Sequence, residues 1–420
     1  MPIADRDDDA EDETGTGAAK RRGEPGRSPV DDLDAALWDS EMGATLPVLC
    51  KPAVAVPEHV ITQAETLELA RKLHADHPQN KLVLRLIENT GVNKRHLIRP
   101  IEETLLHTGF EHRNKVFEAQ AKKRVPAVVD DALANAGLKH EDIGAIVLVS
   151  CTGFMMPSLT AWMINELGFR PDTVQLPIAQ LGCAAGTAAM NRASDFCKAR
   201  PDSHALIVAC EFCSLCYQPT DLDVGSLLSN GLFGDAVAAA VVRGDGRGTG
   251  VRLQAQTSYV MPGTADWICY EVKETGFHFR LNKGVPGTMK EVMPQLTQFV
   301  WDQGEDLGKL DFHVIHTGGP RVLDALRDPG GVSQEKLTDS WDTLASYGNI
   351  ASAAVFDVLR RVAERPVEDG ATGIIAGFGP GITMELALGS WQYDPATVLT
   401  NAELAAGAAA GKDRLAHGLR

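Results

Sequence analysis

The 420-residue chain lacks the features that direct a protein to a membrane or to nucleic acid. No apolar run approaches the length that a transmembrane helix requires, about 18 residues. The first residues are acidic and contain no apolar segment like that of a secretory signal. Acidic residues also outnumber basic ones: the formal net charge is −16, and no basic stripe is present that could neutralise phosphates. We therefore expect a cytoplasmic protein that binds neither a membrane nor nucleic acid.

Several common catalytic motifs are missing as well. The sequence contains no G-x-S-x-G elbow, no Walker loop and no H-E-x-x-H pair, which removes the main support for hydrolase, nucleotidase and zinc-protease functions. Its eight cysteines are too few for a disulfide framework in so large a chain, so we expect free thiols. The spacing of Cys210, Cys213 and Cys216 occurs in iron–sulfur proteins. The usual fourth ligand is absent, however, and a core or pocket role is favoured.

Both ends of the chain differ in composition from its body. Residues 1–45 hold 13 Asp and Glu against 5 Lys and Arg, and they supply −8 of the net charge. This segment has no apolar period, which predicts a disordered acidic tail; alternatively, translation starts at Met42. Residues 395–420 contain an Ala/Gly run and are predicted to form a low-complexity tail.

The body alternates between strand and helix signals, which predicts an α/β fold. Its continuous Val/Ile/Leu runs indicate strands that are buried on both faces. Strand signals over 235–243 and 251–259 flank a glycine-rich segment, and we expect these two strands to pair as a hairpin. The buried-strand runs are 145–150, 205–210, 312–316 and 373–377.

A weak internal repeat divides the body. Cys183 and Asn349 are each followed by small residues, a helix signal, a turn and a buried strand. Two copies of one α/β unit would place these two turns at a shared interface. We therefore predict an N-terminal half over 46–245 and a C-terminal half over 246–394.

Three residues stand where chemistry is expected. Cys183 opens a helix among small residues, and the positive end of the helix dipole is expected to lower its pKa and favour a nucleophilic thiolate. A small buried cysteine is the alternative. His316 ends a strand directly before Thr317-Gly-Gly. This position suits a histidine that transfers protons, and an ordinary buried core histidine is the alternative. Asn349 is either a helix N-cap or an amide donor to an oxyanion.

The order of these three residues along a duplicated α/β chain resembles the thiolase-fold condensing enzymes, and most closely the type III polyketide synthases of the chalcone synthase superfamily. Gly377-Phe-Gly-Pro-Gly is similar to the C-terminal glycine loop of that family. The segments around Phe233 and Phe279 resemble those that carry its two gatekeeper phenylalanines. The resemblance implies a five-layered αβαβα fold built from two duplicated halves, and a homodimer.

Two further segments are similar to the actinobacterial 1,3,6,8-tetrahydroxynaphthalene synthases. These are Val149–Trp162 and Cys210–Asp221. The likeness implies pocket roles for Cys151 and Tyr270 in malonyl priming and chain control, and it implies that Met156 helps to close the partner's cavity. The resemblance also implies cationic residues at the tunnel mouth that meet the phosphates of coenzyme A, and Arg85 is the best positional candidate for one of them. Two departures from the group are Cys269, where serine is expected, and Thr317, where alanine is expected.

The implied reaction is a repeated decarboxylative condensation of malonyl-coenzyme A on Cys183. His316 and Asn349 would stabilise the enolate, and cyclisation would give 1,3,6,8-tetrahydroxynaphthalene. Coenzyme A thioesters would be substrates, with no metal, flavin or nicotinamide cofactor. An alkylpyrone or alkylresorcinol synthase with a fatty acyl starter is the alternative.

Three more distant possibilities are weaker. A degradative thiolase would carry a second cysteine near Gly377–Gly381, and none is present there. A ketoacyl carrier-protein synthase III would lack the two gatekeeper segments. A non-catalytic or iron–sulfur protein on this fold would not need the intact set of Cys183, His316 and Asn349.

Overall fold

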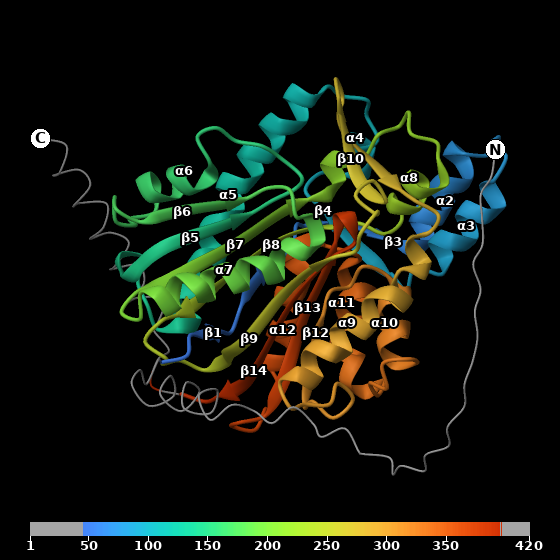
Figure 1. The fold of residues 1–420 in the computed structure, drawn as a ribbon. Coiled ribbons are helices and arrows are strands. Elements are labelled where there is room, and N and C mark those ends of the chain that lie inside the picture. Colours follow the sequence, from blue (N-terminus) through green and yellow to red (C-terminus); the bar gives the residue numbers. More distant parts are fainter. Residues whose placement is uncertain (1–44, 395, 397–420) are drawn as a thin grey trace, which may run out of the picture. The chain divides into compact units, whose positions relative to one another are not determined.

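The structure is a computed structural model that describes residues 45–394 and residue 396 (Figure 1). The two predicted tails therefore lie outside the described residues, apart from Thr45 and Ala396. Within the described range strands and helices alternate, which confirms the predicted α/β class. No helix in this part of the chain is both long and apolar enough to span a membrane.

All four predicted buried strands are present. They are β5 (Ile143–Val149), β7 (His204–Phe212), β12 (Phe312–Ile315) and β13 (Thr372–Gly379). Every residue of β7 is buried. Because successive side chains of a strand point to opposite faces, such a strand needs cover on both sides.

These strands belong to one ten-stranded sheet with the order β12-β13-β14-β9-β1-β8-β7-β5-β6, and β2 pairs additionally with β8. The pairs β5–β7, β5–β6 and β12–β13 are parallel, whereas the strands between β7 and β13 pair antiparallel. The remaining members are β1 (Val48–Cys50), β2 (Ala53–Ala55), β6 (Val174–Ile178), β8 (Asp235–Arg243), β9 (Gly250–Val260) and β14 (Thr383–Gln392).

The predicted hairpin between β8 and β9 is wrong. Both strands exist, but β1 lies between them, with Leu49 opposite Val242 on one side and Val251 on the other. The glycine-rich connection therefore spans the width of an extra strand. Through β1 the strands of the two predicted halves form a single sheet.

Helices lie between and outside the two parts of this sheet, giving five layers (Figure 1). Helices α7 (Ala185–Ala199) and α12 (Ala354–Ala363) share one core with strands from both parts, so they form the central layer. The fold is the predicted thiolase-like αβαβα arrangement. The outer cover of β5, β7 and β8 comes from α5 (Phe110–Ala136) and α6 (Leu159–Glu166), and that of β12–β14 from α9 (Met289–Asp302), α10 (Pro320–Arg327) and α11 (Thr338–Tyr347).

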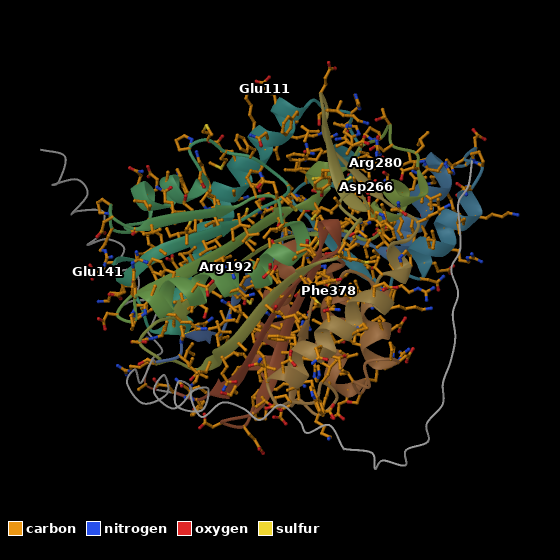
Figure 2. All side chains as sticks on the ribbon, in the orientation of Figure 1. Glu111, Glu141, Arg192, Asp266, Arg280 and Phe378 are labelled. Carbon is orange, nitrogen blue, oxygen red and sulfur yellow. The ribbon has the colours of Figure 1, made fainter. Side chains whose placement is uncertain are left out.

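A group of smaller elements gathers beside one end of the sheet (Figure 1). The hairpin of β10 (Ile268–Lys273) and β11 (Gly276–Leu281) forms a two-stranded sheet of its own, and so do β3 (His59–Thr62) and β4 (Lys94–Leu97). Figure 2 labels Asp266 and Arg280 in the region of the β10–β11 hairpin. The helices of this group are α2 (Gln63–Leu73), α3 (Asn80–Glu88), α4 (Ile101–Thr104) and α8 (Val224–Ser229).

Candidate active site

Cys183 lies in a short 3₁₀ turn, Gly182–Ala184, immediately before α7. Gly182 has φ +50°, and a Cβ atom there would lie 2.6 Å from Cγ of Pro380. A Cβ atom on Gly379 would lie 2.6 Å from the backbone nitrogen of Ala184. The C-terminal glycine loop therefore packs directly on the turn that carries the thiol, and only glycine permits this approach.

Asn349 is held with its amide group turned toward Cys183. Its Oδ1 accepts a hydrogen bond from the backbone N–H of Ala351 at 2.9 Å, which fixes the orientation of the amide. Its Nδ2 lies 3.9 Å from Sγ of Cys183. Ala351 has φ +49°, a strained conformation of the kind that accumulates at functional sites. The structure thus brings together two of the residues selected from sequence, from turns 166 positions apart.

The backbone of Asn349 also reaches the segment of Phe233. Its N–H donates to the carbonyl of Leu232 at 2.9 Å, and its carbonyl accepts from Gly234 at 3.1 Å. This isolated bridge links the Asn349 turn to one of the two predicted gatekeeper positions.

His316 directly follows β12, and its N–H donates to the carbonyl of Ala376 on β13 at 2.9 Å. The residue is only 1% exposed, and its Nδ1 has no hydrogen-bond partner among the described residues. The strand that it bonds, β13, continues into the glycine loop that packs on Cys183. His313 on the same strand bonds the carbonyl of Leu307 at 2.8 Å instead.

The charge states of the thiol and the imidazole are set by burial. Burial lowers the pKa of His316 to about 3, so its imidazole is neutral near pH 7. Burial, and secondly the Glu211 carboxylate, raise the pKa of Cys183 to about 12, against a smaller lowering by Asn349. The lowered pKa expected from the helix N-terminus is therefore wrong for this structure. At rest the Cys183 side chain is therefore a protonated thiol, and the His316 imidazole is neutral.

The reactivity of the Cys183 thiol is expected to depend on pH. Because the pKa of Cys183 is raised, its thiolate fraction is small at neutral pH and grows about tenfold for each pH unit. We expect the rate of Cys183 alkylation by iodoacetamide, followed by peptide mass spectrometry, to rise from pH 6 to pH 9 without a plateau. The urea-unfolded chain is the reference, with an ordinary thiol titration. A plateau below pH 8 in the folded protein would show that the thiolate already exists at rest.

Glu211 is a site residue that sequence reasoning missed. It is fully buried on β7, and burial raises its pKa to about 7 although four groups bond its carboxylate. A glutamate inside an otherwise apolar strand was the available signal. Its donors are Ser352 Oγ at 2.5 Å, the backbone N–H of Cys151 at 3.1 Å, Thr152 Oγ1 at 3.1 Å and Cys151 Sγ at 3.6 Å.

Several thiols lie close to Glu211 and Cys183. Burial and the Glu211 carboxylate raise the pKa of Cys151 well above its ordinary value, and Cys213, Cys183 and Cys216 add to this effect. Cys216 shares a hydrogen bond with Tyr270. No group of three or more His, Cys, Asp or Glu side chains within the described ranges is arranged to hold a metal ion.

An aromatic cluster joins the two predicted gatekeepers. The ring centroids of Phe233 and Phe279 are 5.5 Å apart, and that of Tyr270 is 6.0 Å from Phe279. These three residues line a small cavity, about 90 Å³ in volume, whose other wall comes mainly from α2, α4 and the Cys213–Tyr217 segment. Cys183, His316 and Asn349 do not line this cavity, but Phe233, which does, is linked to Asn349 by the backbone bridge described above.

Two predicted residues lie away from this site in the single chain. Met156 is 85% exposed, in the loop after β5, whereas the neighbouring Met155 packs against the core. Arg85 is exposed on α3, and α3 packs beside α8, the helix that leads to Phe233.

The sequence also matches a known family along most of its length. The N-terminal domain of the chalcone and stilbene synthases matches residues 40–246, and the C-terminal domain of the same family matches residues 252–389. The chain belongs to the chalcone and stilbene synthase family. This confirms the resemblance inferred from the three residues and the glycine loop.

Individual members of the family are highly similar to this chain. A 1,3,6,8-tetrahydroxynaphthalene synthase of Streptomyces coelicolor is 63% identical over 345 residues, which cover 82% of this chain and 92% of the relative. A phloroglucinol synthase of Pseudomonas fluorescens is 46% identical over 344 residues, which cover 82% and 99%. The crystal structure of the S. coelicolor synthase, a bacterial type III polyketide synthase, matches with a TM-score of 0.81 and 62% identity over 83% of this chain and all of that one. The chain is therefore an enzyme of the type III polyketide synthase class.

Proposed function

We propose that the enzyme condenses malonyl-coenzyme A units on Cys183 and cyclises the chain to 1,3,6,8-tetrahydroxynaphthalene. The observation that carries this proposal is the 63% identity to a synthase of that product along nearly the whole relative. The contact of Asn349 Nδ2 with Cys183 Sγ at 3.9 Å supports a shared reaction centre.

The proposed roles come from the resemblance, and they use a neutral His316 and a protonated Cys183. Neutral His316 takes the proton of Cys183 as the sulfur attacks an acyl-coenzyme A, and it returns that proton to the departing coenzyme A thiolate. The N–H groups of His316 and Asn349 then hold the carbonyl of malonyl-coenzyme A while carbon dioxide leaves, which stabilises the enolate. The enolate carbon attacks the Cys183 thioester, so the chain gains two carbons and the thiolate is released.

Other predicted residues shape the cavity in this proposal. Phe233 and Phe279, whose ring centroids lie 5.5 Å apart, form a gate that excludes water from the decarboxylation step. Cys151 and Tyr270 border the growing chain, and the Cys216–Tyr270 hydrogen bond fixes the phenol.

Coenzyme A and a second subunit complete the proposed enzyme. Arg85 is exposed on α3 and is suited to bind a phosphate of coenzyme A. In this proposal the enzyme needs no cofactor besides the coenzyme A thioesters that are its substrates. The 85% exposure of Met156 supports a homodimer in which this side chain is covered by the partner and closes its cavity.

The direct test is incubation of the purified protein with malonyl-coenzyme A alone, with products identified by mass spectrometry. We expect 1,3,6,8-tetrahydroxynaphthalene or its oxidation product flaviolin. The Cys151→Ala variant is expected to lose most of this malonyl-primed product while Cys183 can still be acylated. A shorter product such as phloroglucinol would refute the chain length, and no product from malonyl-coenzyme A would refute malonyl priming.

A fatty acyl starter is the second candidate, because apolar side chains line much of the cavity beyond Phe233 and Phe279. Pyrone or resorcinol products that form only when a fatty acyl-coenzyme A is supplied would favour this alternative. The apolar side chains that line the cavity include Ile61, Leu69, Leu73, Ile101 and Leu105.

A further inference from the structure

We propose that Asp221 is a positioning residue that latches the β10–β11 hairpin, and with it the proposed gate, in the closed arrangement. The inference rests on the proposed roles of Phe233 and Phe279. The hairpin pairs with no strand of the main sheet. It is held by side-chain contacts and by isolated backbone bonds, such as that from Phe110 N–H to the carbonyl of Glu274 at 3.1 Å.

The two faces of the hairpin have different partners. Phe277 and Phe279 alternate with His278 and Arg280 along β11, so the aromatic pair and the polar pair lie on opposite faces. Phe279 stands opposite Tyr270 in the β10–β11 register. The aromatic face therefore belongs to the gate, whereas the polar face meets the loop that leads into α8.

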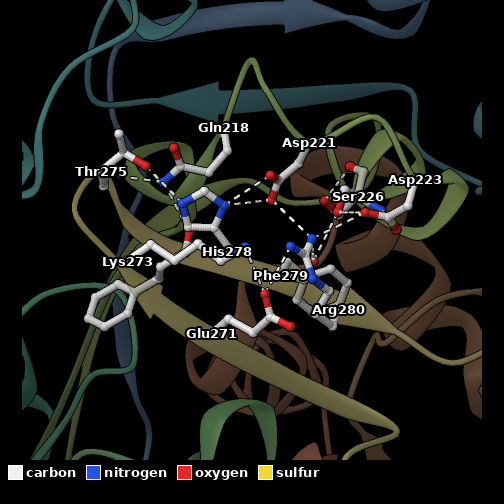
Figure 3. A network of polar contacts seen from close by, with 12 residues as sticks. Gln218, Asp221, Asp223, Ser226, Glu271, Lys273, Thr275, His278, Phe279 and Arg280 are labelled. Carbon is white, nitrogen blue, oxygen red and sulfur yellow. Dashed lines mark hydrogen bonds and ion pairs between the residues drawn. The ribbon is translucent and has the colours of Figure 1, made fainter.

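Asp221 in that loop bonds both polar side chains of β11 (Figure 3). His278 Nδ1 lies 2.9 Å from each carboxylate oxygen of Asp221, and Arg280 donates to Oδ2 at 3.1 Å. Thr275 Oγ1 meets His278 Nε2 at 2.8 Å, which fixes the ring on its other side. The Asp221 side chain is 10% exposed and that of His278 is 5% exposed, so water screens this contact only weakly.

The same loop also contacts α8, the helix that precedes the other gate residue, Phe233. Asp223 caps α8 by accepting the N–H of Ser226 at 3.0 Å, and it also bonds Arg280 at 3.2 Å. The Ser226 hydroxyl lies 2.9 Å from the carbonyl of Phe279 itself. Since α8 leads directly to Phe233, the network ties together the two segments that carry the gate phenylalanines.

Glu271 provides a matched control within the same network. It bonds Arg280 at 3.0 Å and Lys273 at 2.8 Å, but all three residues belong to the hairpin (Figure 3). Removing its charge therefore disturbs the network without cutting the tie between hairpin and loop.

The test compares Asp221→Asn with Glu271→Gln in the full-length protein. Asparagine can still accept from His278, but its amide nitrogen would then face Arg280, so the Asp221–Arg280 ion pair is lost. The more exposed Asp223–Arg280 pair remains. Loss of a buried charged hydrogen bond is expected to raise hydrogen exchange of amides 268–281 about tenfold. The ratio of the rate of Cys183 acylation by hexanoyl-coenzyme A to the rate by malonyl-coenzyme A is expected to rise about fivefold. The amount of acetyl-coenzyme A released per molecule of polyketide product is expected to rise as well. Glu271→Gln should match the wild type, and Asp221→Glu should restore part of the discrimination.

Two results would overturn the latch. One is a folded Asp221→Asn protein whose exchange and acylation ratio equal those of Glu271→Gln. The other is a uniform fall of all activities at an unchanged ratio, as a purely structural role would give. If Asp221→Asn does not fold, Arg280→Gln removes the same pair at a more exposed side chain, together with the pairs to Asp223 and Glu271, and it carries the same expectations. Absence of a naphthalene product in the wild type would refute only the proposed function, because acylation and hairpin exchange do not depend on the final product.

Discussion

Replacement of Cys183 by alanine is expected to abolish polyketide formation, with a loss of at least about 1000-fold, because no other group can carry the acyl chain. Decarboxylation of malonyl-coenzyme A should persist at a measurable rate, since His316 and Asn349 remain to stabilise the enolate. Polyketide products and acetyl-coenzyme A, quantified from one reaction by mass spectrometry, separate the two steps.

A double replacement, Cys183→Ala with Asn349→Leu, serves as the control for that separation. It removes the amide donor as well as the thiol, so acetyl-coenzyme A formation should fall by a further factor of about 100. If Cys183→Ala alone eliminates decarboxylation, the assignment of decarboxylation to His316 and Asn349, without the thiol, is wrong.

The second large effect is expected from Gly182→Ala. Alanine at φ +50° is strained, and its Cβ would meet Pro380 at 2.6 Å, so the thiol turn and the glycine loop must separate. We expect a stability loss of about 3 kcal/mol. We also expect condensation to slow by about 100-fold, because misplacement of reacting groups by about 1 Å has that effect. Thermal unfolding and initial rates measure the two quantities separately.

Gly287→Ala is the matched control for this variant. Gly287 lies in a 3₁₀ turn before α9, and a Cβ atom there would meet nothing within 4 Å. Its rate and melting temperature should equal those of the wild type. A Gly182→Ala enzyme with normal rates would mean that the Cys183 turn tolerates displacement, contrary to the close packing seen here.

The sequence predicted the buried strands well and one pairing badly. Parallel strands covered on both faces leave continuous apolar runs, which is why β5, β7, β12 and β13 could be read directly. The pairing of β8 and β9 could not be read, because it depends on a three-residue strand about 190 positions earlier in the chain. Val48–Cys50 is too short to show any period of its own.

The candidate site was predictable in position but not in its electrostatics. The repeat that surrounds Cys183 and Asn349 was sufficient to place both residues before central helices, and they do lie in contact. The pKa of Cys183 depends instead on tertiary burial and on Glu211. That carboxylate in turn is held by Ser352 and Thr152, from two other parts of the chain, and no local pattern reveals such a grouping.

Insertion of β1 between β8 and β9 has a consequence for biosynthesis. During translation the first 245 residues would leave the ribosome before β9 exists, so the outer edge of β1 would have free N–H and C=O groups until Gly250–Val260 emerges. A polypeptide truncated near residue 245 would retain that open edge permanently, and we expect it to aggregate rather than to form an autonomous half-enzyme. We therefore expect that the two predicted halves cannot be made as separate polypeptides without loss of the fold.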